Sequence, residues 1–179
     1  MPADLLNDYA SRIRAAALTG TPTNPKGVPP ILADLLVAQS KHETGDYTSR
    51  AFTLDNNAFG YSYVQNGKWQ IGPGIIADNG EPVAKYASIE DSTAEIVDWI
   101  YRRINEGKFP ANLGDITTPE RYAQLLKDAG YYGDTVSNYL RGLKRWFQEN
   151  PETGSAAIVA LLVISVWALR KQLRKLLSK

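Results

Sequence analysis

Cysteine is absent from this chain of 179 residues, and histidine occurs once, at His42. The absence of cysteine excludes disulfides, thiolate metal sites and cysteine nucleophiles. A single histidine does not supply the ligands of a histidine-based zinc site, and it disfavours a Ser-His-Asp triad. Any hydrolytic chemistry is therefore expected to rest mainly on carboxylates, without a metal ion or another cofactor.

An excess of charge of either sign is also missing. The chain has 20 Lys and Arg residues against 19 Asp and Glu residues, which gives a formal net charge of +1. No strong overall field attracts nucleic acid, so nucleic acid is not an expected partner. The hydrophobic fraction of 44% and the charged fraction of 22% are typical of a globular domain and argue against disorder.

The spacing of apolar residues predicts a mostly helical α+β domain over residues 1–149. Helix start signals are Ser88 with Asp91 and Thr117 with Glu120, both similar to a capping box. Gly45 is expected to end the second helix, which is apolar enough to be buried. The helices are expected over about 3–18, about 30–43, 89–106, 118–129 and 135–148.

Residues 46–87 have a different character and predict a small antiparallel β lobe. Asn66-Gly67 stands between the β-prone runs 61–64 and 68–71, and Asp78-Asn79-Gly80 repeats the pattern between 75–76 and 83–84. An Asn-Gly pair between such runs is a strong hairpin signal. We therefore expect a hairpin turn at each of the two sites.

The C-terminal part of the chain is strongly apolar and then basic. A turn-prone linker is expected over 150–155, followed by an uncharged run over 156–169 and a cluster of Arg and Lys residues. The run is shorter than the ~20 residues that span a bilayer comfortably, but snorkelling basic side chains would extend it. We expect 156–179 to be a hydrophobic helix anchored in a lipid bilayer; the alternative is a helix that docks on the domain.

The N-terminus lacks the basic start and unbroken apolar stretch of a secretory signal. An anchor without such a signal suggests a bacteriophage protein that is carried in a virion membrane or released at lysis. Virion proteins would then be further partners, and the bacterial inner membrane is the alternative location. Basic residues after an apolar run suit lipid headgroups better than nucleic acid.

The segment Gln39-Ser-Lys-His-Glu43-Thr-Gly45 is the first candidate for chemistry. It places Glu43 at the C-terminal end of a buried helix, facing the β lobe. Apolar surroundings raise the pKa of a carboxyl group, so that it is protonated when it meets a glycosidic oxygen. The carbonyls at a helix C-terminus act in the same direction. From this spacing alone, a solvated helix end is the simpler interpretation.

Further motifs follow Glu43 in the sequence, and they favour a catalytic role over a solvated helix end. With Ala38-Gln39 and Glu43-Thr44-Gly45, they resemble the glucosaminidase domains of glycoside hydrolase family 73 from bacteria and phages, including the cell-wall-cutting domain of flagellar rod-assembly proteins. The resemblance covers about residues 31–147. The motifs are Asn56-Asn57-Ala58-Phe59-Gly60, Lys85-Tyr86-Ala87-Ser88-Ile89-Glu90-Asp91-Ser92, Tyr122-Ala123-Gln124-Leu125-Leu126, Ala129-Gly130-Tyr131 and Tyr139.

This resemblance implies a lysozyme-like fold and a peptidoglycan hydrolase that cleaves β-1,4 glycosidic bonds, with Glu43 as the general acid. It also implies that Asn57, Phe59 and Gly60 shape the sugar cleft and that Tyr131 borders the active site. A turn residue in the left-handed conformation is the plainer interpretation of Asn57, and a core aromatic is that of Phe59.

A second carboxylate is harder to assign. Asp78 and Glu81 flank the second predicted turn and are the candidates for a catalytic role, each with a solvated turn charge as the alternative. Asp46 and Asp55 lie near Glu43 in the sequence and are further candidates. An inverting route, a route assisted by the substrate's N-acetyl group and a lytic transglycosylase route all remain open.

Aromatic residues offer surfaces for sugar binding. Tyr63 is a candidate for the substrate site, as are Tyr61, Trp69 and Tyr132, with packing of the small lobe as the alternative. His42 points about 100° away from Glu43 on a helix and is expected to be a structural or surface histidine. Two non-enzymatic functions stay open: a structural virion or membrane protein with a degenerate lysozyme-like domain, and a glycan-binding module.

Overall fold

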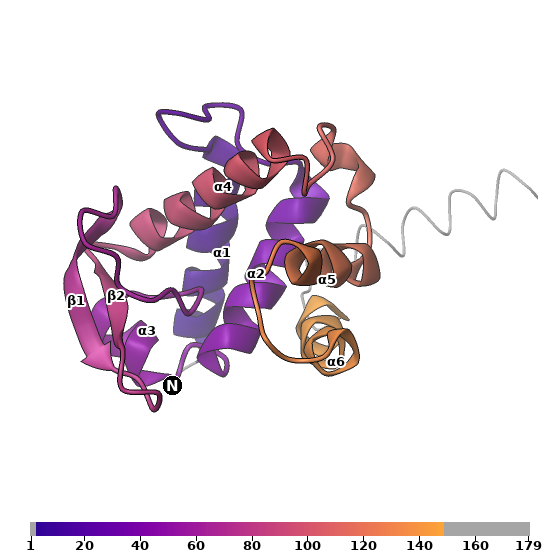
Figure 1. The fold of residues 1–179 in the computed structure, drawn as a ribbon. Coiled ribbons are helices and arrows are strands. Elements are labelled where there is room, and N and C mark those ends of the chain that lie inside the picture. The colour runs from indigo at the N-terminus through magenta and orange to yellow at the C-terminus, as the bar shows by residue number, and fades with distance from the viewer. Residues whose placement is uncertain (1–2, 149–179) are drawn as a thin grey trace, which may run out of the picture. The chain divides into compact units, whose positions relative to one another are not determined.

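The computed structural model describes residues 3–148, which are mostly helical with one two-stranded antiparallel sheet (Figure 1). The described residues up to Phe147 form one compact unit. The predicted α+β class is confirmed for this part of the chain. The elements are α1 (Ala3–Thr19), α2 (Pro30–Thr44), α3 (Arg50–Asp55), β1 (Gln70–Ile76), β2 (Pro82–Tyr86), α4 (Ile89–Asn105), η1 (Leu113–Asp115), α5 (Pro119–Asp128) and α6 (Val136–Gln148).

Helix α2 forms the centre of the core. Figure 1 places it between the sheet with α3 on one side and α5 with α6 on the other. Its Leu32, Leu35 and Leu36 side chains are completely buried, as the apolar run in the sequence predicts. Pro30 occupies the first turn, where no backbone N–H is needed. Gly45 ends the helix in the left-handed conformation, and its N–H bonds the Lys41 carbonyl.

Helix α1 packs against α2 and α4. Its burial deepens along the helix, and Ile13 and Ala17 are completely buried. Leu5 is 40% exposed, because the first turn of α1 contributes little to the core. Leu6 and Tyr9 are the first residues of the helix to pack against it.

The sheet confirms one of the two predicted hairpins. Strands β1 and β2 pair in antiparallel register, and the turn between them contains Asp78-Asn79-Gly80 as predicted. The hairpin expected at Asn66-Gly67 is wrong in its pairing. A tight turn does form there, since the Gly67 N–H bonds the Val64 carbonyl. However, Ser62 pairs with Val83 of β2 rather than with the residues after the turn.

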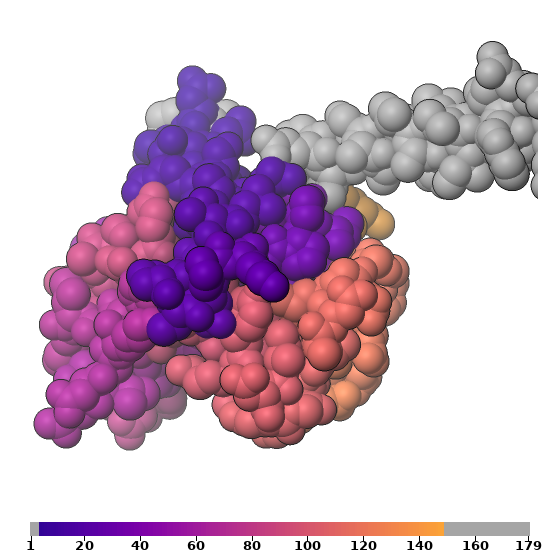
Figure 2. Space-filling model, turned by 90° about the horizontal axis from the view of Figure 1, so that it is seen from above, coloured from indigo at the N-terminus to yellow at the C-terminus, as the bar shows by residue number. Residues whose placement is uncertain are grey.

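Tertiary contacts explain this difference. The side chains of Lys68 and Trp69 both donate hydrogen bonds to Asp98 on α4. Residues 68 and 69 are therefore drawn toward the helix, and β1 begins only at Gln70. Figure 2 shows the resulting β lobe, in magenta, as a projection beside the helical body.

Helix α3 was not predicted, because a stretch of six residues is too short to show helical periodicity. Its ends nevertheless carry recognisable signals. The Ser49 hydroxyl accepts a hydrogen bond from the Phe52 N–H, and Asn56 ends the helix in the left-handed conformation. Phe52 is buried against the core. The helix lies against β1 and β2 and ties the small lobe to the helical body.

The remaining helices begin close to the expected residues. The Ser88 hydroxyl accepts from the Asp91 N–H, as the capping pattern predicted. Helix α5 is capped by Thr118 and not by Thr117, since Pro119 occupies its first position. Among residues 3–148, no helix is long and apolar enough to cross a membrane. The predicted linker (150–155) and anchor helix (156–179) lie outside the described residues.

Candidate active site

A cleft of about 540 Å³ opens beside the C-terminal end of α2. We call it the Glu43 cleft. Its walls come from α2, the segment after α3, α4, the segment between α5 and α6, and α6 itself. Its lining residues are His42, Glu43, Phe59, Gly60, Tyr61, Ser62, Val64, Trp99, Gly130, Tyr131, Tyr132, Gly133, Asp134 and Tyr139.

Glu43 lies in the last turn of α2 and reaches the cleft, although protein atoms surround most of its side chain. Burial raises the pKa of Glu43, because it disfavours the charged carboxylate. A hydrogen bond of 2.7 Å from the Tyr139 hydroxyl to Oε1 acts in the opposite direction and is the smaller effect. The net shift favours a protonated carboxyl group, as general acid catalysis requires.

Gly60 allows the backbone to approach this carboxyl group closely. Its φ angle is +66°, which lies in the left-handed region that favours glycine. A Cβ atom at this position would lie 3.3 Å from Glu43 Oε2. The predicted role of Gly60 in shaping the cleft thus has a geometric basis: a side chain here would crowd the oxygen that Tyr139 does not bind.

Aromatic rings support the cleft opposite α2. The Tyr131 hydroxyl donates a short hydrogen bond of 2.5 Å to the Phe59 carbonyl, which joins the segment before α6 to the segment after α3. The Tyr131 ring makes edge contacts with Tyr61 and Trp99, with centroid distances of 6.0 and 5.3 Å. Phe59 is only 1% exposed. The structure therefore brings Phe59 and Tyr131 together at the cleft, where the family resemblance placed them.

Asn57 is not among the lining residues of the cleft, and its predicted role in shaping the cleft stays a prediction. The side chain is 1% exposed. Its Nδ2 donates to the carbonyls of Tyr61 and Ala84, and its Oδ1 accepts from the Tyr61 N–H. Its amide thus holds the chain that leads into the small lobe. The left-handed conformation considered for Asn57 belongs to the preceding residue, Asn56, whose φ angle is +52°.

The segment 130–134 lines one part of the cleft and is held by contacts with α5 and α6. Lys127 Nζ donates to the backbone carbonyls of Gly133 and Asp134, at 3.0 and 2.8 Å. The Tyr132 ring stacks on Tyr139 with a centroid distance of 3.9 Å and an interplanar angle of 6°. One lysine and one stacked ring pair therefore help to hold a segment that contributes five of the lining residues.

Asp134 is the second carboxylate of the cleft wall, and the sequence analysis did not select it. The backbone N–H of Thr135 and, to a lesser extent, the Asn138 amide hold the pKa of Asp134 below its usual range. Asp134 lies two residues before the start of α6, and an aspartate near a helix start is a common signal that would have drawn attention to the residue. Its position on the rim gives the cleft a second acidic group beside Glu43.

The other carboxylate candidates lie elsewhere. Asp78 and Glu81 are exposed on the turn between β1 and β2 and are not among the lining residues of the cleft. Asp55 is buried, and its Oδ2 accepts the Ile75 N–H at 2.8 Å, so it holds α3 against β1. Asp46 lies 3.5 Å from the Lys41 ammonium group. A catalytic role for Asp78 or Glu81 stays a prediction.

His42 lines the cleft, but its contacts are structural. Its ring makes an edge contact with Tyr139 at a centroid distance of 4.9 Å. A Cβ atom at Gly142 would lie only 2.3 Å from the His42 ring, so α6 can pack here only because residue 142 has no side chain. Burial lowers the pKa of His42 and outweighs the opposing effect of Asp134. The imidazole is therefore neutral near pH 7.

Of the remaining aromatic candidates, Tyr61 and Tyr132 line the cleft, whereas Tyr63 and Trp69 are not among its lining residues. The indole N–H of Trp69 is used by Asp98. Within the described range, no group of three or more His, Asp or Glu side chains is placed to hold a metal ion. The lining of the cleft is thus largely aromatic, and its acidic groups are Glu43 and Asp134.

Comparison with known proteins decides the family. The sequence model described as mannosyl-glycoprotein endo-beta-N-acetylglucosaminidase matches residues 28–152, which is most of the chain. The chain belongs to the glucosaminidase family. This glucosaminidase is therefore a glycoside hydrolase, and the resemblance found in the sequence motifs is confirmed.

Two solved structures share the fold of this glucosaminidase. The glycoside hydrolase domain of FlgJ from Salmonella typhimurium is 20% identical, with a TM-score of 0.54 over 93% of this chain and 98% of that chain. A chain of a type VI secretion system effector–immunity complex from Pseudomonas protegens is 17% identical, with a TM-score of 0.50 over 79% and 93%. No curated protein sequence gives a match.

Proposed function

We propose that this glucosaminidase cleaves β-1,4 glycosidic bonds in the glycan strands of peptidoglycan, with Glu43 as the general acid. The observation that carries the proposal is a glutamate with a raised pKa at the end of a buried helix, in a cleft with aromatic walls. The likeness to the FlgJ glycoside hydrolase domain supports the choice of a bacterial glycan.

The hydrogen bond from Tyr139 suggests which oxygen carries the proton. Oε1 of Glu43 accepts the Tyr139 hydroxyl, so Oε2 is the oxygen that can bear a proton and donate it. Oε2 is also the oxygen next to Gly60, where the missing side chain leaves room. Glu43 then protonates the glycosidic oxygen while the bond from that oxygen to C1 breaks, and water adds its hydroxyl group to C1 and gives its remaining proton to the group that assists this step.

A second part of the proposal concerns the group that assists the attack of water at C1. Asp134 is on the cleft rim, whereas Asp78 and Glu81 are on an exposed turn. Comparing Asp134→Asn with Asp78→Asn and Glu81→Gln separates these candidates. If all three variants keep wild-type activity, the substrate's own N-acetyl group or a transglycosylase route becomes the favoured mechanism.

Mass spectrometry of digested peptidoglycan tests the proposal. The full chain is compared with Glu43→Gln and with Glu106→Gln, which removes an exposed glutamate beyond the end of α4. We expect new N-acetylglucosamine reducing ends from the wild type and from Glu106→Gln, and none from Glu43→Gln. Muramic reducing ends would identify a muramidase, and anhydromuramic ends a transglycosylase. The absence of fragments from several wall types would favour a glycan-binding or structural function.

We also propose that residues 156–179 anchor the enzyme in a lipid bilayer. The support is the uncharged run 156–169 and the basic residues after it, both read from the sequence. Flotation with anionic liposomes tests this: the full chain should float and a chain ending at residue 150 should not. A place in a virion membrane is a further prediction, and consistent absence from purified particles would contradict it.

A further inference from the structure

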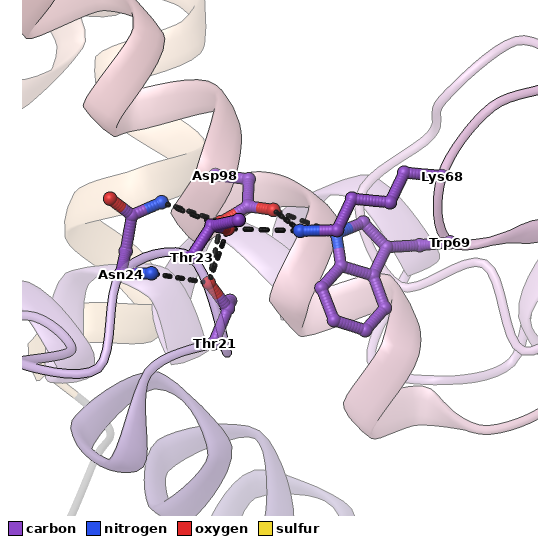
Figure 3. A network of polar contacts seen from close by, with 6 residues as sticks. All are labelled: Thr21, Thr23, Asn24, Lys68, Trp69 and Asp98. Atoms are coloured by element: carbon purple, nitrogen blue, oxygen red, sulfur yellow. Dashed lines mark hydrogen bonds and ion pairs between the residues drawn. The ribbon is translucent and has the colours of Figure 1, made fainter.

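Asp98 lies in the middle of α4 and is the acceptor for five side-chain donors (Figure 3). Its side chain is almost completely buried, with 7% of the residue exposed. The donors come from two separate loops. Oδ1 accepts from Thr21 at 2.6 Å, Thr23 at 2.9 Å and Asn24 at 2.6 Å, and Oδ2 accepts from Lys68 Nζ at 2.9 Å and the Trp69 indole at 3.0 Å.

The two loops also contact each other around this carboxylate. Lys68 Nζ donates to the Thr23 hydroxyl at 2.9 Å and lies over the Trp69 ring, 4.6 Å from its centroid. Burial alone would raise the pKa of Asp98, but the surrounding hydrogen bonds hold it far below its usual range. The group therefore stays ionised at any pH at which the protein is expected to work. A buried ion with complete hydrogen bonding favours one arrangement of its partners.

The Lys68 loop is connected to the wall of the Glu43 cleft. Val64 lines the cleft. Its carbonyl accepts the Gly67 N–H at 2.9 Å, and its own N–H donates to Gln70 Oε1 at 2.8 Å. Gln70 in turn donates to Glu95, three residues before Asp98 on the same helix. The segment from Val64 to Gln70 is thus held against α4 by the carboxylates of Glu95 and Asp98.

Helix α4, which carries Asp98, also contributes to the wall of the cleft. Trp99, the residue after Asp98, lines it from α4. A change in the distance between the Lys68 loop and α4 would therefore move Val64 relative to Trp99. Asp98 itself is not a lining residue and cannot contact the substrate there.

We infer that Asp98 is a positioning residue: by binding Lys68 and Trp69 it fixes the segment 64–69 against α4, and so sets the spacing between Val64 and Trp99, two lining residues of the substrate cleft. The inference rests on the proposed function for the identity of the substrate, a glycan strand. It assigns a role in substrate binding to a network that lies outside the cleft.

Two single substitutions, each removing one donor from the same carboxylate, test this. Lys68→Met releases the loop on the cleft side, and the half-exposed lysine makes this variant compatible with folding. Asn24→Leu is the matched control, because it removes a donor from the loop between α1 and α2. Lys68→Arg, which keeps the charge and the donors, should restore the wild-type behaviour.

The measurements are KM and kcat with soluble glycan strands, and hydrogen exchange of residues 61–70, all on the full chain. For Lys68→Met we expect KM to rise about three- to tenfold while kcat stays within about twofold, since the loop does not touch Glu43. Exchange in 61–70 should become faster. Asn24→Leu should leave both KM and this exchange unchanged, even if its thermal stability falls.

Three results would overturn the inference. They are an unchanged KM in Lys68→Met despite faster exchange, unchanged exchange in that variant, or an equal rise of KM in Asn24→Leu. A wild-type protein that releases no fragments would instead count against the proposed function. In that case, the dissociation constant for the same glycan strands, measured with Glu43→Gln alone and combined with Lys68→Met, still decides whether Asp98 acts on the cleft.

Discussion

The hydroxyl of Tyr139 donates a hydrogen bond of 2.7 Å to Oε1 of Glu43, and this contact joins α6 to the end of α2 across 96 positions of the chain. A donor to a carboxylate stabilises the charged form, whereas burial destabilises it. Both effects act on Glu43, and burial is the larger. The pKa of Glu43 therefore depends on two opposing effects, and single substitutions can shift it in a known direction.

Replacing Tyr139 with Phe removes the donor and leaves the burial, so the pKa of Glu43 should rise further. The acid then stays protonated to higher pH, and the alkaline limb of kcat/KM should move upward. Tyr101→Phe is the control, because it also removes one hydroxyl, which donates to the Gly27 carbonyl. A limb that moves to lower pH in Tyr139→Phe, or that moves equally in the control, would contradict this role of Tyr139.

Glu43→Gln should lower kcat by about 10²- to 10⁴-fold, the usual contribution of a general acid. It should also change the pH dependence of stability. Because the pKa of Glu43 is raised in the folded protein, its stabilising effect is complete below the unfolded pKa and is lost as pH rises through the folded pKa. Urea unfolding should therefore show Glu43→Gln gaining stability relative to wild type between about pH 4 and neutral pH. A constant difference across this range would contradict the assignment.

Gly60→Ala should reduce both stability and activity. A left-handed alanine costs about 1–2 kcal/mol, and the new Cβ would lie 3.3 Å from Glu43 Oε2. Gly107→Ala is a matched control, since Gly107 has a φ angle of +72° and open space around it. Both variants should lose similar free energy of unfolding, but only Gly60→Ala should lose about tenfold or more in kcat/KM. Equal activities would show that crowding at Glu43 has no effect.

Lys127→Met should loosen the rim of the cleft. The lysine holds the carbonyls of Gly133 and Asp134, so we expect KM to rise about threefold or more, with faster hydrogen exchange in 130–135. Lys144→Met removes a lysine that pairs with Glu120 away from the cleft and should leave KM unchanged. If the KM values of the two variants agree, Lys127 does not position the rim.

Asn57→Leu should destabilise the fold by about 3 kcal/mol, because it removes three hydrogen bonds between a buried side chain and the backbone, each worth about 1 kcal/mol. Thermal unfolding measures the loss. At a temperature where the variant is folded, its binding of glycan strands should be only slightly weaker than that of the wild type, because Asn57 does not line the cleft. A large loss of binding with normal stability would instead indicate direct contact between Asn57 and the substrate.

The long helices could be predicted because their apolar spacing and end signals are local. Gly45 and Ser88 act where the sequence suggested. Glu43 became a candidate through its place at the end of an apolar helix, and the neighbouring family motifs then favoured it. Helix α3 is too short to show a period, and Thr118 replaced Thr117 by a shift of one residue. Predictions of this kind fail mainly at element boundaries.

Long-range polar contacts could not be predicted. Lys68 and Trp69 looked like the second arm of a hairpin, but Asp98, about 30 residues later, removes them from the sheet. Asp134 was missed for a related reason. Its place on the cleft rim depends on Lys127 holding the backbone, and no spacing in the sequence records that contact.

The close approach of His42 and Gly142 lies between the helices that carry Glu43 and Tyr139. His42 is the neighbour of Glu43, and Gly142 lies one helical turn after Tyr139. The His42 ring occupies the space that a side chain at position 142 would need. It therefore fixes the position of α6 along and around the axis of that helix. The alignment of the Tyr139 hydroxyl with Glu43 then depends on His42 and Gly142, which are not proposed to take part in the chemistry. Positions 42 and 142 should consequently change together among relatives, a larger residue at one being accepted only with a smaller residue at the other.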